Sequence, residues 1–258
     1  MFLVYNDIVG YDYRVKLRLF MNYDAVVRAT FIRRMNRFIA QVNLDGEVVE
    51  VHVKNTGRCA ELFVEGAQVY LEPAKNPERK TRYSLIAIFK NGILINIDSQ
   101  IPNAVAYEAI TSNPHLRNII GEVTTLRREV TFQKSRFDIY YENAETGNKG
   151  FIEVKGVTLE AEGEAMFPDA PTSRGTKHIR ELMDSIDEGF QSYILFVVQL
   201  KGVTIFRPNQ KTDPLFSKTL KEAQKKGVQI LCYDSIVTPD SIRLDQPVAM
   251  KIEAMEHF

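Results

Sequence analysis

From residue 26 to about residue 97, short apolar stretches alternate with polar turns in a pattern typical of β-strands. Side chains of a strand point alternately to the two faces of a sheet, so a half-buried strand is apolar at every second position. Asp45-Gly46 and Asn91-Gly92 favour hairpin turns. Strands are expected at Val26–Arg34, Phe38–Val42, Val48–Val53, Gln68–Leu71, Tyr83–Phe89 and Ile93–Ile97. This many short strands in roughly 70 residues predicts an OB-like barrel, with an SH3-like barrel as an open alternative.

Beyond a boundary near residues 98–102, strands alternate with helices. Asn103 is a candidate N-cap for a first helix. Helical spacing of apolar residues predicts a second helix over Thr176–Glu188, and Asp213-Pro214 with Gly227 brackets a third. Strands are expected at Arg136–Tyr141, Phe151–Leu159, Tyr193–Val198 and Val228–Tyr233. The order β-β-α-β-α-β predicts an α/β domain built on a mixed sheet.

These patterns divide the chain into a β-barrel domain over residues 1–97 and an α/β domain over residues 98–258. Residues 1–22 are harder to place. Val15–Phe20 alternates like an edge strand, but no sheet is indicated for it, so the role of this extension stays open.

Composition describes a soluble globular protein, because 45% of the 258 residues are hydrophobic and 26% are charged. The two cysteines, Cys59 and Cys232, lie far apart without a metal-binding context, which predicts buried thiols in a reducing compartment. We expect a cytoplasmic protein without membrane association, because the chain starts without a basic, apolar leader and has no apolar run of about 18 residues.

Charge is balanced over the whole chain but not between its two parts. The formal net charge is +0, which excludes a polycation that coats nucleic acid. Residues 1–97 carry fourteen Lys and Arg against ten Asp and Glu, a surplus of four positive charges that the rest of the chain offsets. A basic first part suits an acidic partner such as nucleic acid, although counting noise explains so small a surplus equally well.

The candidate chemistry lies on the two predicted strands around Asp138 and Glu153, whose alternation of apolar and polar residues is typical of half-buried strands. A polar turn over residues 142–149 would join them into a hairpin. Such a turn places Asp138 opposite Glu153, with Lys155 one step further along the same face. Two neighbouring carboxylates repel each other unless a cation lies between them, so they are candidate ligands of a divalent ion. Such an ion can polarise a phosphoryl oxygen and lower the pKa of a bound water, and a neighbouring lysine can stabilise negative charge, which together suit hydrolysis of a phosphodiester. The alternative is a solvated strand face on which Lys155 forms an ion pair with Glu153 or Asp138.

Six short motifs, in order, resemble the sugar fermentation stimulation protein A (SfsA) family. They are Arg33-Arg34-x-Asn36-Arg37-Phe38, His52-x-x-Asn55-Thr56-Gly57-Arg58, Ser135-Arg136-x-Asp138, Glu153-Val154-Lys155-x-x-Thr158-Leu159, Phe167-Pro168-Asp169-Ala170 and Arg174-Gly175-x-Lys177-His178. The resemblance covers roughly residues 24–245. It implies an OB-like domain that binds nucleic acid, followed by a restriction-endonuclease-like domain in which Asp138, Glu153 and Lys155 form the metal site. Because folds of that kind often pair to cut two strands, a homodimer stays open.

Other side chains are candidates around this centre. Glu108, on the helix before the hairpin, is a candidate third metal ligand, or else a solvent-facing glutamate. Arg136, Arg174 and Lys177 are candidates for binding phosphate, the last two beside a helix N-terminus. On the barrel, the candidates for nucleic-acid binding are Arg33, Arg34, Asn36, Arg37, His52, Asn55 and Arg58. We expect Phe38 to point into the barrel core. His178 is expected to brace a loop, with a role as a catalytic base as the alternative.

The sequence therefore predicts a nuclease that depends on Mg²⁺ or Mn²⁺ and acts on DNA or RNA. The alternative is a non-catalytic DNA-binding protein that regulates sugar-metabolism genes, the role for which the resembled family is named. Strandedness, end or internal cutting, and sequence preference are not predicted.

Overall fold

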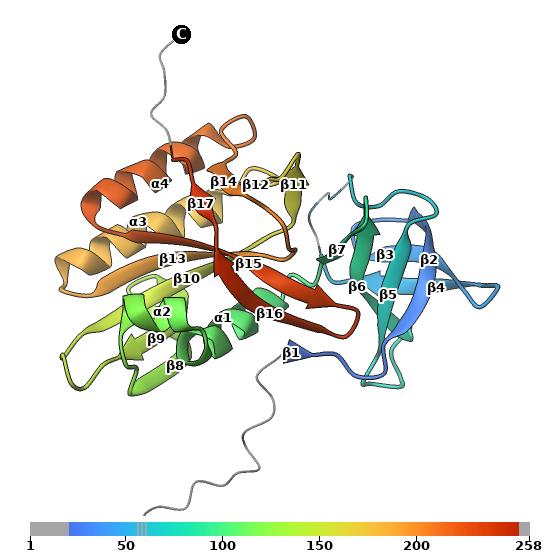
Figure 1. Cartoon of the computed structure of the whole chain (residues 1–258), viewed down its shortest axis with the longest axis horizontal. Coiled ribbons are helices and arrows are strands. Elements are labelled where there is room, and N and C mark those ends of the chain that lie inside the picture. The colour runs from blue at the N-terminus through green and yellow to red at the C-terminus, as the bar shows by residue number, and fades with distance from the viewer. Residues whose placement is uncertain (1–20, 56, 58, 60, 253–258) are drawn as a thin grey trace, which may run out of the picture.

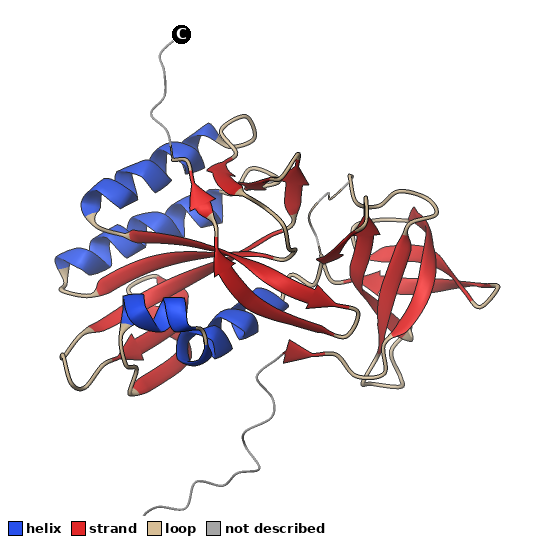
Figure 2. Cartoon of the chain, viewed as in Figure 1, coloured by secondary structure: helices blue, strands red, loops and turns tan. Residues whose placement is uncertain are grey.

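The structure is a computed structural model that describes residues 21–252 except 56, 58 and 60. Figure 1 shows a barrel of strands beside a larger α/β domain. The described helices all lie in the larger domain (Figure 2). No helix among the described residues is both long and apolar enough to cross a membrane. Val15–Phe20, for which an edge strand was expected, lies outside the described residues.

The barrel is closed by one parallel pairing. Its strands are β2 (Val27–Arg34), β3 (Ile39–Leu44), β4 (Glu47–Val53), β5 (Gln68–Pro73), β6 (Tyr83–Lys90) and β7 (Ile93–Asn96). The sheet order is β4-β3-β2-β5-β6-β7, and an additional pairing of β4 with β6 closes a ring of five strands. Closure removes the exposed edges of a sheet and encloses a core that includes Phe31, Val51 and Leu85. The expected OB-like barrel is confirmed.

The second domain is a mixed seven-stranded sheet between two layers of helices (Figure 1). Its order is β1 (Met21–Asn22), β16 (Ser241–Pro247), β15 (Gln229–Thr238), β13 (Gln191–Val198), β10 (Lys149–Val157), β9 (Ser135–Glu142) and β8 (Thr125–Phe132). The parallel pairs β10–β13 and β13–β15 are joined through helices, as the β-β-α-β-α-β pattern predicts. The short strand β1 adds to this sheet and not to the barrel.

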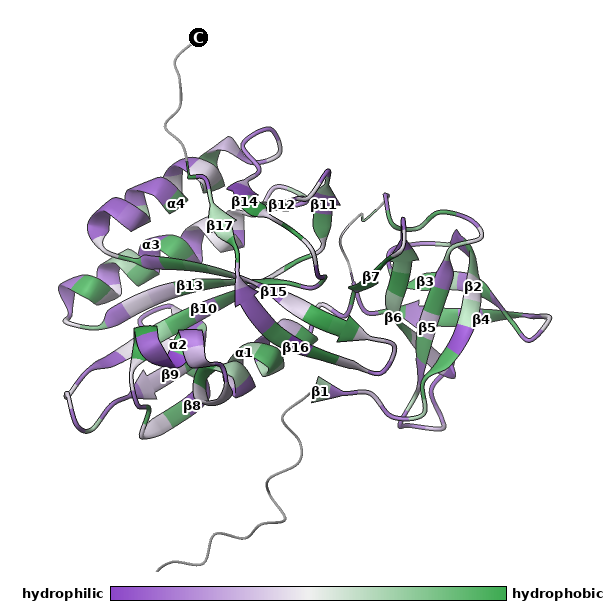
Figure 3. Ribbon diagram, in the orientation of Figure 1, coloured by the Kyte–Doolittle hydropathy of each residue, from purple (hydrophilic) through white to green (hydrophobic). Residues whose placement is uncertain are grey.

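Helices cover both faces of the sheet. On one face are α1 (Ile101–Ser112) and α2 (Pro114–Ile120), and on the other are α3 (Ser173–Asp187) and α4 (Pro214–Lys226). Alternate residues of β13 pack into the two layers, with Tyr193 and Leu195 towards α1 and Phe196 towards α3. Hydrophobic residues accordingly run along the middle strands, and hydrophilic residues cover the outer sides of α3 and α4 (Figure 3).

The helix ends were predicted with mixed success. Asp213 caps α4 by accepting from the Phe216 amide at 2.9 Å, and Gly227 ends the helix at a φ of 111°, both as expected. The helix α3 begins one turn before the predicted Thr176, because Thr172 is its N-cap. The prediction for Asn103 was wrong, since α1 starts at Ile101 and leaves Asn103 in its first turn.

A small second sheet was not predicted. It consists of β11 (Leu159–Ala161), β12 (Glu164–Phe167), β14 (Ile205–Pro208) and β17 (Ala249–Met250). This sheet touches the barrel, because Lys90 of β6 donates to the Glu160 carbonyl oxygen at 2.8 Å. The two cysteines are buried and unpaired, as expected.

Candidate metal centre and nucleic-acid surfaces

The two acidic strands meet in the predicted register and then part. Glu142 pairs with Lys149 and Ile139 with Ile152, so the same register would bring position 138 opposite position 153. The ladder ends at Ile139, and the side chain of Asp138 continues it by accepting the Val154 amide at 2.8 Å. The hairpin thus delivers Asp138 to the segment that carries Glu153.

Glu153 is a buried carboxylate held from two sides. It is 2% exposed, and its Oε1 lies 2.5 Å from both Lys155 Nζ and His178 Nδ1. Burial alone would raise the pKa of Glu153, but the Lys155 ammonium and the hydrogen bond with His178 lower it below its usual value. Glu153 therefore stays ionised although water is excluded. The ion pair between Lys155 and Glu153, which was the alternative to a metal site, is present, but Glu153 is buried and not on a solvated strand face.

Both faces of β10 are covered, so the half-buried strand expected here was wrong. Phe151, Ile152 and Val154 are buried together with Glu153, because α1 packs over one face and α3 over the other. The alternation of polar and apolar residues marked a buried polar site and not a solvent face.

His178 belongs to this centre, although the sequence favoured a loop-bracing role for it. It is 6% exposed, and Arg174 Nε donates to its Nε2 at 3.4 Å. If Nε2 accepts from Arg174, the proton of the neutral ring lies on Nδ1 and is donated to Glu153. The local signal was the spacing of Arg174 and His178 by one helical turn, which places both on one face of α3.

Asp138 differs from Glu153 in that its surroundings raise its pKa. Burial and the negative charge of Glu153 raise its pKa, while the Val154 amide, Lys155 and Asn103 oppose the rise. Asn103 Nδ2 donates to Asp138 Oδ1 at 2.7 Å, so this residue serves the acid and not the helix end. A cation between the two acids would remove the repulsion that raises the pKa of Asp138.

The donor set fits a divalent metal ion with oxygen ligands. Glu153 Oε2 is buried, and the described residues provide no hydrogen-bond partner for it. A buried carboxylate oxygen without a partner is costly, and a metal ion would satisfy it. Among the described residues, no three His, Cys, Asp or Glu side chains gather as a ligand set. Two carboxylates with water and substrate oxygens are sufficient for Mg²⁺, which usually keeps several waters.

Glu108 is not brought to these two acids. It lies on α1 and lines a separate cavity of about 320 Å³, together with His115, Arg243 and Asp245 among others. Burial raises its pKa and Arg128 opposes the rise. The geometry therefore gives no support to Glu108 as a third ligand.

A basic pocket opens beside the acidic centre. Its lining joins the β8–β9 turn to the first turns of α3, and its volume is about 460 Å³. The lining residues are Lys134, Ser135, Arg136, Ser173, Arg174, Lys177 and His178. Three of these, Arg136, Arg174 and Lys177, were candidates for binding phosphate. His178 belongs both to this pocket and to the carboxylate centre, so the two are neighbours.

On the barrel, the loop between β2 and β3 presents an apolar and basic surface. Phe38 is 51% exposed and Met35 is 46% exposed, so the expectation that Phe38 points into the core was wrong. Arg33 and Arg37 are exposed in the same segment. An exposed ring with arginines nearby is the combination that stacks bases and binds phosphates on single strands. In OB folds this loop and the neighbouring strands form the usual ligand surface.

Arg34, a nucleic-acid candidate, is bound within the protein instead. Its guanidinium lies 4.6 Å from the centre of the Phe63 ring. It also donates to the carbonyl oxygens of Asn36, Arg37, Asn55 and Gly57, at 2.7–3.2 Å. These four acceptors belong to two separate loops, which Arg34 therefore holds together.

The remaining barrel candidates shape turns or stay unassigned. Asn36 Oδ1 accepts from the Phe38 amide at 2.8 Å, and Asn55 Oδ1 accepts from the Gly57 amide at 2.8 Å. His52 is half-buried on the outer side of β4, and burial, with Arg79 and Lys54 nearby, lowers its pKa. Arg58 lies outside the described residues.

Comparison with known proteins identifies the family. The model of the SfsA N-terminal OB domain matches residues 32–97, and that of the sugar fermentation stimulation protein RE domain matches residues 100–241. The chain belongs to the SfsA family. An SfsA homologue of Alkaliphilus oremlandii is 50% identical over 91% of this chain and all of its own length. A second homologue, from Clostridium botulinum strain Langeland, is 50% identical over 88% of this chain and 97% of its own.

A solved SfsA structure shares the whole architecture. It is that of Pyrococcus furiosus SfsA in complex with Ca²⁺, with a TM-score of 0.79 and 28% identity over 90% of this chain and 98% of that one. The resemblance inferred from the six motifs is thus confirmed, as is the two-domain fold that it implied.

Proposed function

We propose that this SfsA protein is a metal-dependent nuclease that hydrolyses phosphodiester bonds of DNA or RNA. The observation that carries the proposal is the buried carboxylate of Glu153, which has one oxygen without a partner among the described residues, a second acid nearby and a basic pocket alongside. A purely structural hairpin has no need of this arrangement. The Ca²⁺ bound by the Pyrococcus furiosus relative is consistent with a divalent ion in the family.

Each residue of the centre has a separate task in this proposal. Asp138 and Glu153 would hold Mg²⁺ or Mn²⁺, with His178 positioning Glu153 through its hydrogen bond. When bound, the ion supplies a Lewis acid for a phosphoryl oxygen and lowers the pKa of a water molecule. Lys155, 15% exposed at its side chain, would donate to the negative charge that grows on the phosphate.

The two surfaces outside the centre would bind the substrate. Arg136, Arg174 and Lys177 line the pocket beside Glu153 and would hold a phosphate next to the site of cutting. Phe38, with Arg33 and Arg37, would hold a more distant part of the strand on the barrel.

The test is incubation of the full chain with single- and double-stranded DNA and RNA, with Mg²⁺, with Mn²⁺ or with a chelator. We expect cutting that requires metal and that falls more than about 100-fold in Glu153→Gln. Asp184→Asn, at an exposed acid of α3, is the matched control and should cut normally. The proposal would be refuted if none of the substrates is cut, or if Glu153→Gln cuts as well as the parent protein.

A second candidate is a DNA-binding protein without catalysis, and the exposed Phe38 loop is the observation that favours it. It predicts salt-sensitive binding that survives Glu153→Gln, in a protein that cuts nothing. We rank it second, because binding alone does not require a buried carboxylate with an unpaired oxygen.

A further inference from the structure

The basic pocket beside Glu153 carries more positive charge than one internal phosphodiester would neutralise. Four cations line it, namely Lys134, Arg136, Arg174 and Lys177. Two of them are balanced by acids, Arg136 by Glu129 at 3.4 Å and Lys177 by Glu181 at 3.6 Å. The other two, Lys134 and Arg174, have no acidic partner in the part of the chain that the structure describes, so two positive charges remain. A phosphate monoester carries about −1.5 to −2 near neutral pH, whereas an internal phosphodiester carries a single charge.

Neutral donors in the pocket also suit a phosphate. The 15-residue helix α3 begins here, and the free amides at a helix N-terminus favour anions. Ser135 is 4% exposed and lines the pocket, and its Oγ has no hydrogen-bond partner among the described residues. Buried hydroxyls are nearly always hydrogen-bonded, so a partner for Ser135 is missing. A phosphate oxygen would accept this hydrogen bond.

The position of the pocket relates the bound phosphate to the site of cutting. His178 lines the pocket, and its Nδ1 lies 2.5 Å from Glu153 Oε1. A group bound in the pocket is therefore separated from the carboxylate centre by one side chain. We propose that the pocket binds the terminal phosphate monoester of a nucleic-acid strand, so that the protein acts close to a strand end. This inference rests on the proposed nuclease function and names its substrate as an end-phosphorylated strand.

The phosphate could belong to the 5′ or the 3′ end, and a binding experiment separates the two. One oligonucleotide sequence is prepared with a 5′ phosphate, with a 3′ phosphate or with hydroxyl groups at both ends. Fluorescence anisotropy then measures the binding of each form to the full chain in a chelator, so that nothing is cut. We expect one phosphorylated form to bind about tenfold more tightly than the hydroxyl form, since hydrogen bonds to charged groups are strong.

Two pocket variants and one control test whether this preference comes from the pocket. Lys134→Gln, which removes one of the two charges without an acidic partner, should bring the affinity ratio of the phosphorylated and hydroxyl forms close to one. Lys218→Gln on α4 is the control and should leave the ratio unchanged, because Lys218 is also exposed but does not line the pocket. Ser135→Ala should lower the ratio by a smaller factor.

The results distinguish this inference from the nuclease proposal. Equal binding of all three forms would overturn the end-binding pocket even if the metal-loaded protein cuts. The end-binding pocket would also be overturned if Lys134→Gln and Lys218→Gln lowered the affinity ratio equally. An end preference in a protein that never cuts would support the pocket and refute the nuclease.

Discussion

Glu153 and His178 show what a sequence pattern reveals about single residues and what it leaves out. The two-residue period of a strand placed Asp138, Glu153 and Lys155 together, because neighbours across a hairpin follow from local geometry. His178 is 25 residues away from Glu153 and reaches it only after the chain crosses over the sheet. The periodicity of a strand or helix cannot predict a contact between residues so far apart in the sequence. The same holds for Asn103, whose amide contacts Asp138 from α1.

The role of His178 as a positioning residue can be tested through metal binding. His178→Ala should lower the affinity for Ca²⁺ about 10–100-fold, as loss of a side chain that orients a metal ligand usually does. Isothermal titration calorimetry measures this directly. His178→Gln should restore part of the affinity, since its amide can donate to Glu153. Unchanged affinity in His178→Ala, or a similar loss in the exposed control His115→Ala, would contradict this role.

Phe38 was assigned to the core because aromatic residues within strand patterns are usually buried. It precedes β3 and lies in a loop, where the alternation of the strand no longer applies. We expect Phe38→Ala to weaken binding to single-stranded nucleic acid by about 1–3 kcal/mol, through loss of stacking. Its free energy of unfolding should change by less than about 0.5 kcal/mol.

Leu215→Ala is the matched control for Phe38→Ala, because Leu215 on α4 is also 51% exposed. It should leave both binding and stability nearly unchanged. Binding by fluorescence anisotropy and unfolding by urea separate the two effects. A Phe38→Ala protein that binds normally would remove this loop from the nucleic-acid surface.

At the scale of elements, α3, α4 and the middle strands of the α/β domain were predictable, because caps and apolar periods are local signals. The helix α2 and the strand β16 were not predicted. The predicted and observed bounds of α4 agree at both ends, where Asp213 and Gly227 act through their own backbone geometry. The small sheet of β11, β12, β14 and β17 has no comparable signal. Its strands have two to four residues, too few for a period to emerge.

The loops of the barrel depend on Arg34, which provides a test at this scale. Arg34→Ala removes the donor to four carbonyl oxygens and should reduce the free energy of unfolding by about 1–3 kcal/mol. Arg34→Lys should recover little, because an ammonium cannot span the four acceptors as a planar guanidinium does.

Urea unfolding measures the free energy of unfolding of both variants. Arg33→Ala is the control and should have a much smaller effect, since Arg33 is exposed and its Nε donates only to the Gln41 side chain among the hydrogen bonds described, at 2.9 Å. A stable Arg34→Ala protein with weakened binding to nucleic acid would return Arg34 to the set of direct ligands.

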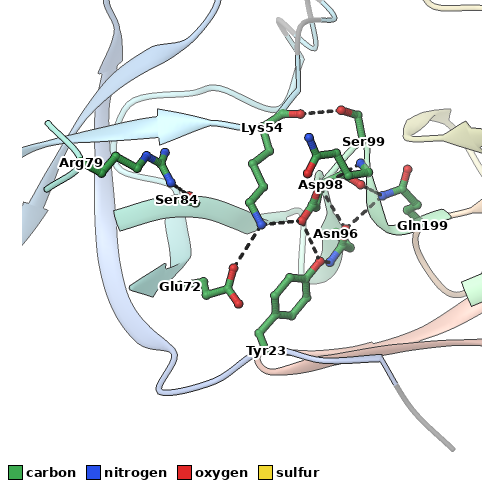
Figure 4. Close-up of polar contacts among 10 residues, drawn as sticks. Tyr23, Lys54, Glu72, Arg79, Ser84, Asn96, Asp98, Ser99 and Gln199 are labelled. Atoms are coloured by element: carbon green, nitrogen blue, oxygen red, sulfur yellow. Dashed lines mark hydrogen bonds and ion pairs between the residues drawn. The ribbon is translucent and has the colours of Figure 1, made fainter. Parts of the chain in front are cut away.

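At the scale of the whole molecule, a buried polar network joins the barrel to the α/β domain (Figure 4). Lys54, at the end of the barrel, donates to Asp98 at 2.9 Å and to Glu72 at 3.1 Å. Asn96 donates to the Tyr23 hydroxyl at 2.9 Å. Asn96, Asp98 and Gln199 are each no more than 2% exposed. Contacts of this kind were beyond sequence reasoning, because their members come from five separate segments.

Such a network holds two domains in one orientation, because buried polar groups tolerate few alternative arrangements. The barrel surface at Phe38 would thus keep a constant relation to the acidic centre. A nucleic-acid strand bound to both the Phe38 surface and the acidic centre would therefore span a fixed distance. Loss of the network should therefore affect both stability and the relative position of the domains.

Gln199→Ala tests this expectation with little disturbance of packing. Gln199 Nε2 donates to Asn96 Oδ1 and to the Asp98 carbonyl oxygen, both at 3.0 Å, so its loss removes two buried hydrogen bonds and leaves each acceptor with one remaining donor. We expect the free energy of unfolding to fall by about 1–3 kcal/mol and small-angle X-ray scattering to show a broader range of domain orientations. Gln133→Ala, at an exposed glutamine bonded to Glu188 at 3.0 Å, should change neither. A double-mutant cycle with Asn96→Ala should give a coupling above about 0.5 kcal/mol, whereas additive effects would mean that the two side chains act independently and that the domains are held by other contacts.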